Sequence, residues 1–304
     1  MPRPLVIGSR GSKLALWQAE QTRERLLLLN PQTEIRIEII KTTGDVKHEP
    51  LSIIGGKGVF TKELEDALLD ERIDIAVHSL KDLPTILPEA LLISAICERE
   101  DARDALVLRP DLSVENGSLL NLPRGATVGT SSQRRLAQLK ALRGDTVVKD
   151  LRGNVDTRIR KLDEGQYDAV ILASAGLVRL GLQNRISRRI AINEMLPAVG
   201  QGAIAIETRQ GDKHAVETTS KLDHPETRLA CLGERAFLRG LGGGCQLPIA
   251  AHATIDGDLL NLDGLVAKPD GSEIWRDRLS GPVEQAEEIG STLAAKLIER
   301  GATL

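Results

Sequence analysis

Arginine residues recur in this chain where a short apolar run gives way to a helical pattern. Ligands of α/β proteins bind beyond the carboxyl ends of strands and beside helix N-termini. A planar guanidinium group is suited to bidentate capture of a carboxylate or a phosphate. One arginine near a helix end is most often a surface residue, but four such junctions in a chain of net charge −3 predict a small polyanionic ligand. The arginines concerned are Arg10, Arg134, Arg135, Arg152, Arg158 and Arg179.

Hydroxyl side chains accompany these arginines. Ser12 belongs to the stretch SRGS, and Ser131 and Ser132 belong to the stretch GTSSQRR. Such residues either cap a helix N-terminus or donate hydrogen bonds to a bound anion. The sequence alone leaves both roles open.

The stretch AVHSLKDLP places a lysine and an aspartate together just past an expected strand. Lys81 and Asp82 are adjacent there. An exposed charge pair would contribute little to stability. In a binding site, the carboxylate of Asp82 would stabilise a developing positive charge, and Lys81 would add to anion capture. From the residues alone the two interpretations are balanced.

Two glycine-rich turns carry further candidates. GGKGVF contains Lys57 and Phe60, lacks the spacing of a phosphate-binding loop, and predicts a mobile loop near a cleft. LGGGCQLP contains Cys245, which is either incidental or a covalent attachment point. The other cysteines, Cys97 and Cys231, lie in apolar patterns and are expected to be packing residues.

Composition excludes several classes of protein. The 304 residues are 41% hydrophobic and 27% charged, which is ordinary for a globular protein of two or three domains. A nucleic-acid-binding protein would usually show a basic domain with aromatic platforms, whereas aromatics make up 2% of this chain. No run approaches the length of a membrane span, and no metal-ligand spacing occurs. We therefore expect a cytoplasmic protein without nucleic-acid or membrane partners and without a metal.

Short strands alternate with helical patterns over the first two-thirds of the chain, which predicts parallel βαβ layers in two α/β sets. A segment at 196–209 contains a strand that could return to the first sheet. After His224 the pattern changes to a helix, three alternating strands and a final helix, an α+β arrangement. The predicted domains are 1–98 with 198–220, then 103–195, then 223–304. The expected strands are 4–8, 34–40, 73–77, 91–96, 104–108, 147–151, 168–173 and three near 249–256, 260–267 and 274–279, and the expected helices include 61–70 with Thr61 as N-cap, 155–165, 225–239 and 283–300.

Seven stretches together resemble the porphobilinogen deaminase family, whose members are also called hydroxymethylbilane synthases. They cover nearly the whole chain and occur in the family's order. The stretches are SRGSKLALWQA, GGKGVFTKELE, DIAVHSLKDLP, GTSSQRR, LRGNVDTR, LPAVGQGA and LGGGCQLPIAA. The resemblance implies two α/β lobes built like periplasmic binding proteins, plus a smaller α+β C-terminal domain. It also implies a monomer.

The resemblance further implies a transferase of tetrapyrrole (heme) biosynthesis. Four porphobilinogen molecules would condense head to tail onto a covalently bound dipyrromethane primer, releasing ammonia, and hydrolysis would release hydroxymethylbilane. Cys245 would anchor the primer by a thioether, and Asp82 would be catalytic. Primer-binding residues would be Ser79, Lys81, Asp82, Thr130, Ser132, Arg134, Arg135 and Arg158. Substrate-binding residues would be Arg10, Ser12, Lys57, Phe60, Arg152, Arg179 and Gln201.

A non-catalytic, two-lobed anion-binding protein is the competing hypothesis. It would account for the lobes and the arginines. It gives no reason for Cys245, for the third domain, or for Asp82 beside Lys81. Solute receptors of that kind also usually carry an export signal, and the sequence begins directly with a strand pattern.

Overall fold

The computed structural model describes residues 3–42, 61–115, 118–243 and 247–302. The chain divides into two compact units, which are described separately. The first comprises Met1–Arg99 and Ala203–Arg228, and the second comprises Glu100–Gly202 and Leu229–Leu304. Among the helices of the described residues, none combines the length and the apolar character needed to cross a bilayer.

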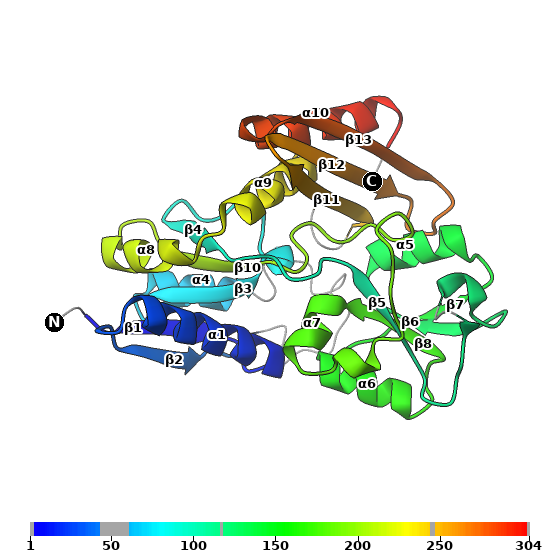
Figure 1. Ribbon diagram of the computed structural model, residues 1–304, viewed down its shortest axis with the longest axis horizontal. Coiled ribbons are helices and arrows are strands. Elements are labelled where there is room, and N and C mark those ends of the chain that lie inside the picture. The colour runs from blue at the N-terminus through cyan, green and yellow to red at the C-terminus, as the bar shows by residue number, and fades with distance from the viewer. Residues whose placement is uncertain (1–2, 43–60, 116–117, 244–246, 303–304) are drawn as a thin grey trace. The chain divides into compact units, whose positions relative to one another are not determined.

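The first unit is built on a five-stranded mixed sheet in the order β2-β1-β3-β10-β4. Ile75 and Val77 of β3 face one apolar cluster with α1 and α8, whereas Ala76 faces another cluster with α4. Alternate residues of the strand thus enter cores on opposite faces of the sheet. The strands are β1 (Leu5–Ser9), β2 (Ile35–Ile39), β3 (Ile75–Ser79), β4 (Leu91–Ile96) and β10 (Ile204–Arg209), and the helices are α1 (Lys13–Leu29), α4 (Lys62–Leu69), η1 (Leu80–Asp82), α8 (Lys213–Thr219) and η5 (Ser220–Leu222) (Figure 1).

The second unit contains a five-stranded mixed sheet in the order β7-β6-β8-β5-β9. Ile171 of β8 packs in a cluster with Leu139 of α5, whereas Val170 and Leu172 pack with α6 and α7. This sheet is therefore also covered on both faces. Its strands are β5 (Asp104–Leu108), β6 (Thr127–Gly129), β7 (Val147–Lys149), β8 (Ala169–Ala173) and β9 (Arg188–Arg189), and its helices are η3 (Leu119–Asn121), α5 (Gln133–Leu142), α6 (Val155–Asp163), α7 (Ser174–Arg179) and η4 (Gln183–Arg185).

A three-stranded antiparallel sheet, β11-β12-β13, completes the second unit. Helices α9 and α10 pack on one face of it, around Phe237 and Leu293. On the other face, Ala250 and Leu265 pack against Ala137 of α5, the helix that also packs on the five-stranded sheet of the same unit. Its elements are α9 (Pro225–Gly240), β11 (Ile249–Asp256), β12 (Leu259–Ala267), β13 (Ile274–Pro282), η6 (Val283–Gln285) and α10 (Ala286–Glu299).

These sheets confirm the predicted fold class of two α/β sheets followed by a smaller α+β part. The strand of segment 196–209 does return to the first sheet, as β10 between β3 and β4. The expectation of purely parallel layers was wrong. Strand β10 enters beside Ser79 at the carboxyl end of β3 and must run antiparallel to it. Strand β5 likewise runs antiparallel to β8.

Two local predictions also need correction. Thr61 does occupy the N-cap position of α4, but its backbone is in the α region (φ −116°, ψ −30°) and its side chain makes no capping hydrogen bond. An N-cap usually has an extended backbone that aims its oxygen at the helix. Strand β7 ends at Lys149 and does not reach Leu151, because both the N–H and the carbonyl of Leu151 bond to Ser131 Oγ.

Candidate functional site

In the first unit, the predicted residues lie at the carboxyl ends of two parallel strands, β1 and β3. Arg10 follows β1, and Ser12 caps α1 by accepting a hydrogen bond from the N–H of Ala15 (3.3 Å). Ser79 ends β3 and receives a hydrogen bond from the amide of Gln18 on α1 (2.9 Å). The second turn of α1 and the end of β3 are therefore tied together at this sheet edge.

The turn after β3 is held by buried contacts. His78 Nε2 lies 2.9 Å from Glu207 Oε2, and both side chains are buried. The N–H of Leu80 donates to the carbonyl of Ala203 (3.0 Å), and the Leu80 side chain is buried. These contacts fix the strand immediately before Lys81 and Asp82, which are the next residues of the chain.

Lys81 and Asp82 occupy the short helix η1 and are half-buried. Leu83, which follows, is fully buried and donates its N–H to the carbonyl of Leu80 (3.1 Å). The turn is thus anchored on both sides by leucines, while the two charged side chains remain partly accessible. This arrangement suits a carboxylate that must meet a ligand.

In the second unit, the stretch GTSSQRR forms the junction between β6 and α5. Ser132 is the N-cap and accepts a hydrogen bond from the N–H of Arg135 (3.4 Å). The N–H of Ser132 donates to Thr130 Oγ1 (3.2 Å). Ser131 instead donates its hydroxyl to the carbonyl of Leu151. Of the two roles that the sequence left open for these serines, the structure gives Ser132 the capping role.

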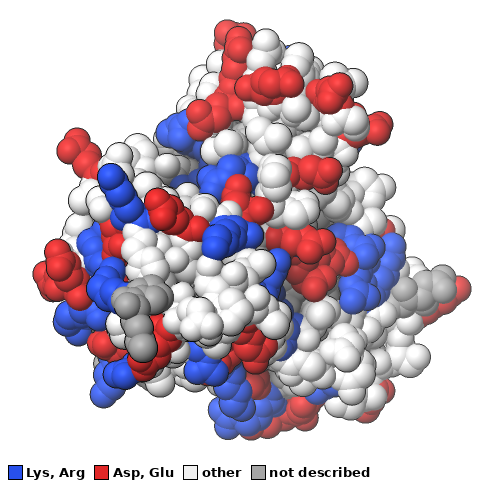
Figure 2. Space-filling view, turned by 60° about the vertical axis from the view of Figure 1, so that its left-hand side comes forward, with Lys and Arg blue, Asp and Glu red and all other residues white. Residues whose placement is uncertain are grey.

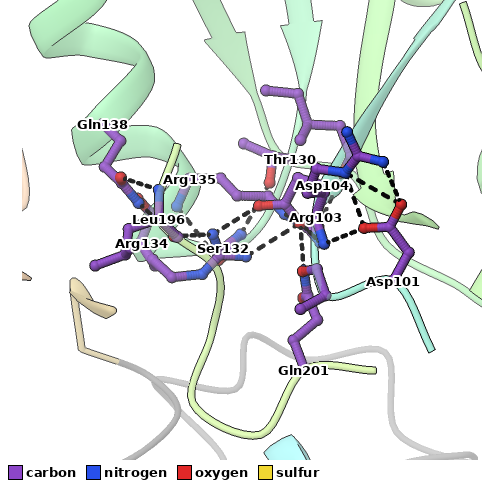
Figure 3. A network of polar contacts seen from close by, with 12 residues as sticks. Asp101, Arg103, Asp104, Thr130, Ser132, Arg134, Arg135, Gln138, Leu196 and Gln201 are labelled. Carbon is purple, nitrogen blue, oxygen red and sulfur yellow. Dashed lines mark hydrogen bonds and ion pairs between the residues drawn. The ribbon is translucent and has the colours of Figure 1, made fainter. Parts of the chain in front are cut away.

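Arg134 and Arg135 meet a protein carboxylate that sequence reasoning did not single out (Figure 3). Arg134 Nη1 donates to Asp104 Oδ2 (2.7 Å) and to the carbonyl of Leu196 (2.8 Å). Arg135 Nη2 donates to Asp104 Oδ1 (2.8 Å), and its Nη1 donates to the carbonyl of Ile171 (2.9 Å). The exposed fractions of the two arginines are 4% and 5%, and that of Asp104 is 0%.

The position of Asp104 follows from the sheet topology. Asp104 is the first residue of β5 and pairs with Ala173, the last residue of the antiparallel strand β8. It therefore lies at the carboxyl end of β8, the same edge at which Arg134 and Arg135 lie in the first turn of α5. The sequence does carry a signal for this position, because an acidic residue opens the apolar run DALVL. The apolar pattern by itself predicts only a strand there.

Electrostatics keep Asp104 ionised. Burial by itself would raise the pKa of this carboxyl group, but the positive charges of Arg134 and Arg135 and their hydrogen bonds hold the pKa well below its usual range. Burial lowers the pKa of Arg134, while Asp104 opposes that effect. The group is therefore a stable buried carboxylate between two guanidinium groups.

Gln201 joins the same cluster. Its amide nitrogen donates to Asp104 Oδ1 (2.9 Å) and to the carbonyl of Ala102 (2.7 Å), and the side chain is fully buried. Gly200 and Gly202 flank it with φ values of +69° and +92°, which favour glycine. We call Asp104, Arg134, Arg135 and Gln201 the Asp104 cluster.

Three further predicted arginines lie at the same sheet edge in different surroundings. Arg152 is half-buried and pairs with Asp150 (2.6 Å). Arg158, also half-buried, donates from Nε to the carbonyl of Gly153 (2.7 Å). Arg179 ends α7, is buried, and donates to the carbonyl of Gly202 (2.6 Å).

Three predicted site residues, Lys57, Phe60 and Cys245, lie outside the described residues. The two other cysteines, Cys97 and Cys231, are buried, as expected of packing residues. The structure thus describes both strand-end groups of the predicted site, one in each unit, but not the two glycine-rich turns.

The Asp104 cluster fits a ligand that carries carboxylates. Two guanidinium charges against one carboxylate leave one positive charge in excess. Among the described residues, Asp104 and the carbonyls of Leu196 and Ile171 accept hydrogen bonds from three of the five N–H groups of each arginine. Figure 2 shows lysines and arginines interspersed with acidic side chains over the face in view. Arg134 and Arg135, by contrast, are buried.

Comparison with known proteins identifies the family. Residues 5–217 match the family model "Porphobilinogen deaminase, dipyromethane cofactor binding domain", and residues 228–299 match "Porphobilinogen deaminase, C-terminal domain". The chain belongs to the porphobilinogen deaminase family. A porphobilinogen deaminase of Pelobacter propionicus is 50% identical over 301 residues, covering 99% of this chain and 95% of that protein. One of Chromobacterium violaceum is 50% identical over 299 residues, covering 98% and 95%.

Solved structures of other proteins also match, at lower identity. An ancestral arginine-binding protein bound to arginine gives a TM-score of 0.40 at 17% identity, covering 73% of this chain and 91% of that one. The VFT2 domain of Bordetella pertussis BvgS gives 0.42 at 16% identity, covering 72% and 86%. Family membership rests on the sequence matches.

Proposed function

We propose that this chain is a porphobilinogen deaminase, a transferase that condenses four porphobilinogen molecules head to tail onto a dipyrromethane primer. Ammonia is released at each addition, and hydrolysis then releases hydroxymethylbilane. The two family-model matches and the near-full-length relatives support this activity. The observation in the structure that best supports it is the Asp104 cluster, because a buried pair of arginines with one positive charge in excess suits a ligand rich in carboxylates.

The proposed residues divide between the primer and the incoming substrate. When bound, the dipyrromethane group supplies the pyrrole carbon to which new units are added. Cys245 would hold it covalently. Its carboxylates and ring N–H groups would be held by Ser79, Lys81, Asp82, Thr130, Ser132, Arg134, Arg135 and Arg158. The substrate would be held by Arg10, Ser12, Lys57, Phe60, Arg152, Arg179 and Gln201.

Asp82 is the proposed catalytic residue. Porphobilinogen carries a protonated aminomethyl arm, and positive charge develops on the pyrrole when ammonia leaves. The Asp82 carboxylate would accept a hydrogen bond from the pyrrole N–H and stabilise that charge. The short helix η1 keeps this carboxylate half-buried beside Lys81, where partial exclusion of water strengthens the interaction.

The oligomeric state, the location and the domains of the chain belong to the same proposal. The chain would act as a monomer, in the cytoplasm, and with three domains bounded at 1–98 with 198–220, 103–195 and 223–304. The division of the five-stranded and three-stranded sheets of the second unit is consistent with the last of these. Size-exclusion chromatography with light scattering would test the monomer.

Ammonia release from porphobilinogen tests the activity. The parent chain should release ammonia and form a linear tetrapyrrole, and Asp82→Asn should lower the rate by about 10²-fold or more. The substitution keeps the side-chain shape and removes the charge. The primer should remain attached to the variant, as judged by intact mass, because Cys245 is unchanged.

Asp70→Asn is a matched control, since Asp70 is an exposed acid at the end of α4 in the same unit. It should leave the rate unchanged. Absence of ammonia release by the parent chain would refute the proposed activity. Equal rates for Asp82→Asn and the parent would remove Asp82 from the mechanism while leaving the activity in place.

A further inference from the structure

Asp104 is a buried carboxylate that none of the proposed steps uses. It has no exposed surface, and it is ion-paired to two of the arginines proposed to hold the primer. Within the part of the chain that the structure describes, it is the only carboxylate that forms an ion pair with either arginine. We propose that Asp104 is a positioning residue, which orients Arg134 and Arg135 so that a carboxylate of the primer can bind them. This inference rests on the proposed function.

The hydrogen bonds around Asp104 fix both guanidinium groups. Oδ2 accepts from Arg134 Nη1 (2.7 Å). Oδ1 accepts from Arg135 Nε (3.1 Å) and Nη2 (2.8 Å), and from Arg134 Nη2 (3.3 Å). Nε and Nη2 form one edge of a guanidinium plane, so Arg135 is held edge-on by a single oxygen. Long side chains that would otherwise sample several rotamers are held in one arrangement.

Backbone carbonyls complete the restraint. Arg134 donates to the carbonyl of Leu196, and Arg135 donates to the carbonyl of Ile171 on β8. These carbonyl acceptors are neutral, so they fix the orientation of the guanidinium groups without neutralising their positive charge. The two arginines therefore keep one positive charge in excess while their orientations are set. A buried excess charge is unfavourable until an anion binds, which favours a ligand carboxylate at this point.

Gln201 orients Asp104 itself. Its amide donates to Asp104 Oδ1 and to the carbonyl of Ala102, two residues earlier in the chain. The carboxylate thus receives one neutral donor in addition to the two charged partners. This donor leaves the charge of the cluster unchanged, so its effect is on the position of the carboxylate.

The charge of Asp104 and its positioning of the arginines have opposite expected effects on primer binding in Asp104→Asn. The substitution raises the excess charge of the cluster from one to two, which by charge alone would strengthen binding of an anionic primer. It also turns an amide N–H toward guanidinium N–H groups and releases the arginines. Positioning predicts that the fraction of purified chain carrying the primer mass falls by about ten-fold or more.

The experiment compares intact mass, circular dichroism and kinetics for the parent, Asp104→Asn and Asp101→Asn. Asp101 lies on the same segment and pairs with Arg103 and Arg189, which are not proposed site residues. Its variant should keep full primer occupancy and an unchanged KM. Folded Asp104→Asn with full or increased occupancy and unchanged KM would overturn the inference.

A second variant tests the inference if Asp104→Asn does not fold. Gln201→Met keeps the side-chain volume and removes the donor to Asp104 Oδ1. If Gln201 acts through the cluster, primer occupancy falls; if it only touches substrate, KM rises with the primer mass complete. The latter result in a folded variant would overturn the inference. A parent chain without any primer mass would instead refute the proposed function, so the two failures are distinguishable.

Discussion

Two pairs of arginines follow neighbouring strands of one sheet but are held in different ways. Arg134 and Arg135 lie in the first turn of α5 and are almost fully buried around Asp104. Arg152 and Arg158 flank the start of α6 and remain half-buried, with Arg152 paired to Asp150. The first pair is buried around a shared carboxylate, whereas the second is half-buried and bonded to nearby residues of its own segment. The same residue type at the same kind of junction is thus held in two different environments.

The largest effect is expected for Arg135→Leu. The change leaves Asp104, which is fully buried, with one ionic partner in place of two. Removing one partner of a buried ion pair costs about 3–5 kcal/mol. The free energy of unfolding, measured in urea, should fall by an amount of that order. Intact-mass measurement should show that the primer is lost. A loss below about 1 kcal/mol would mean that Arg135 is not a structural partner of Asp104.

The acid dependence of stability should be smaller but distinctive. The folded pKa of Asp104 lies below its unfolded value of 3.8, so the folded state favours the ionised carboxylate. Its contribution is complete above the unfolded pKa and is lost as the pH falls toward the folded pKa. The free energy of unfolding should therefore fall more steeply below about pH 4 in the parent than in Asp104→Asn. Parallel curves would show that Asp104 is not preferentially ionised in the folded state.

Arg152→Leu should have the smallest effect on stability. The Arg152 side chain is 33% exposed and pairs with Asp150, whose side chain is 58% exposed. Such exposed ion pairs contribute about 0–1 kcal/mol to stability, so the free energy of unfolding should change by no more than that. Turnover should nevertheless fall, with the primer mass retained, because the residue would bind incoming substrate. Loss of the primer, as expected for Arg135→Leu, would erase the distinction between the two pairs.

Several strands were predictable because their signals are local. The runs LLISAI and DALVL correspond to β4 (Leu91–Ile96) and β5 (Asp104–Leu108) without adjustment. Both are continuous apolar runs that can be buried on both faces of a sheet. The alternating pattern of 249–256 likewise gave the bounds of β11.

Strand direction and the partner of the arginines were not predictable, because both depend on distant residues. Strand β10 is antiparallel because the chain re-enters the first sheet beside Ser79, a fact of topology rather than of its own residues. Asp104 is separated from Arg134 by 30 positions and is brought to it by the antiparallel pairing of β5 with β8. The spacing of apolar residues along the chain carries no information about an ion pair between such distant residues.

Intact-mass spectrometry of the purified chain, beside Cys245→Ser, is the most direct test of a covalently tethered dipyrromethane. The parent, prepared with substrate available, should be heavier than its sequence mass by two pyrrole units. The Cys245→Ser variant should have the mass of its sequence alone. A parent at its bare sequence mass, or equal increments on both chains, would contradict the account.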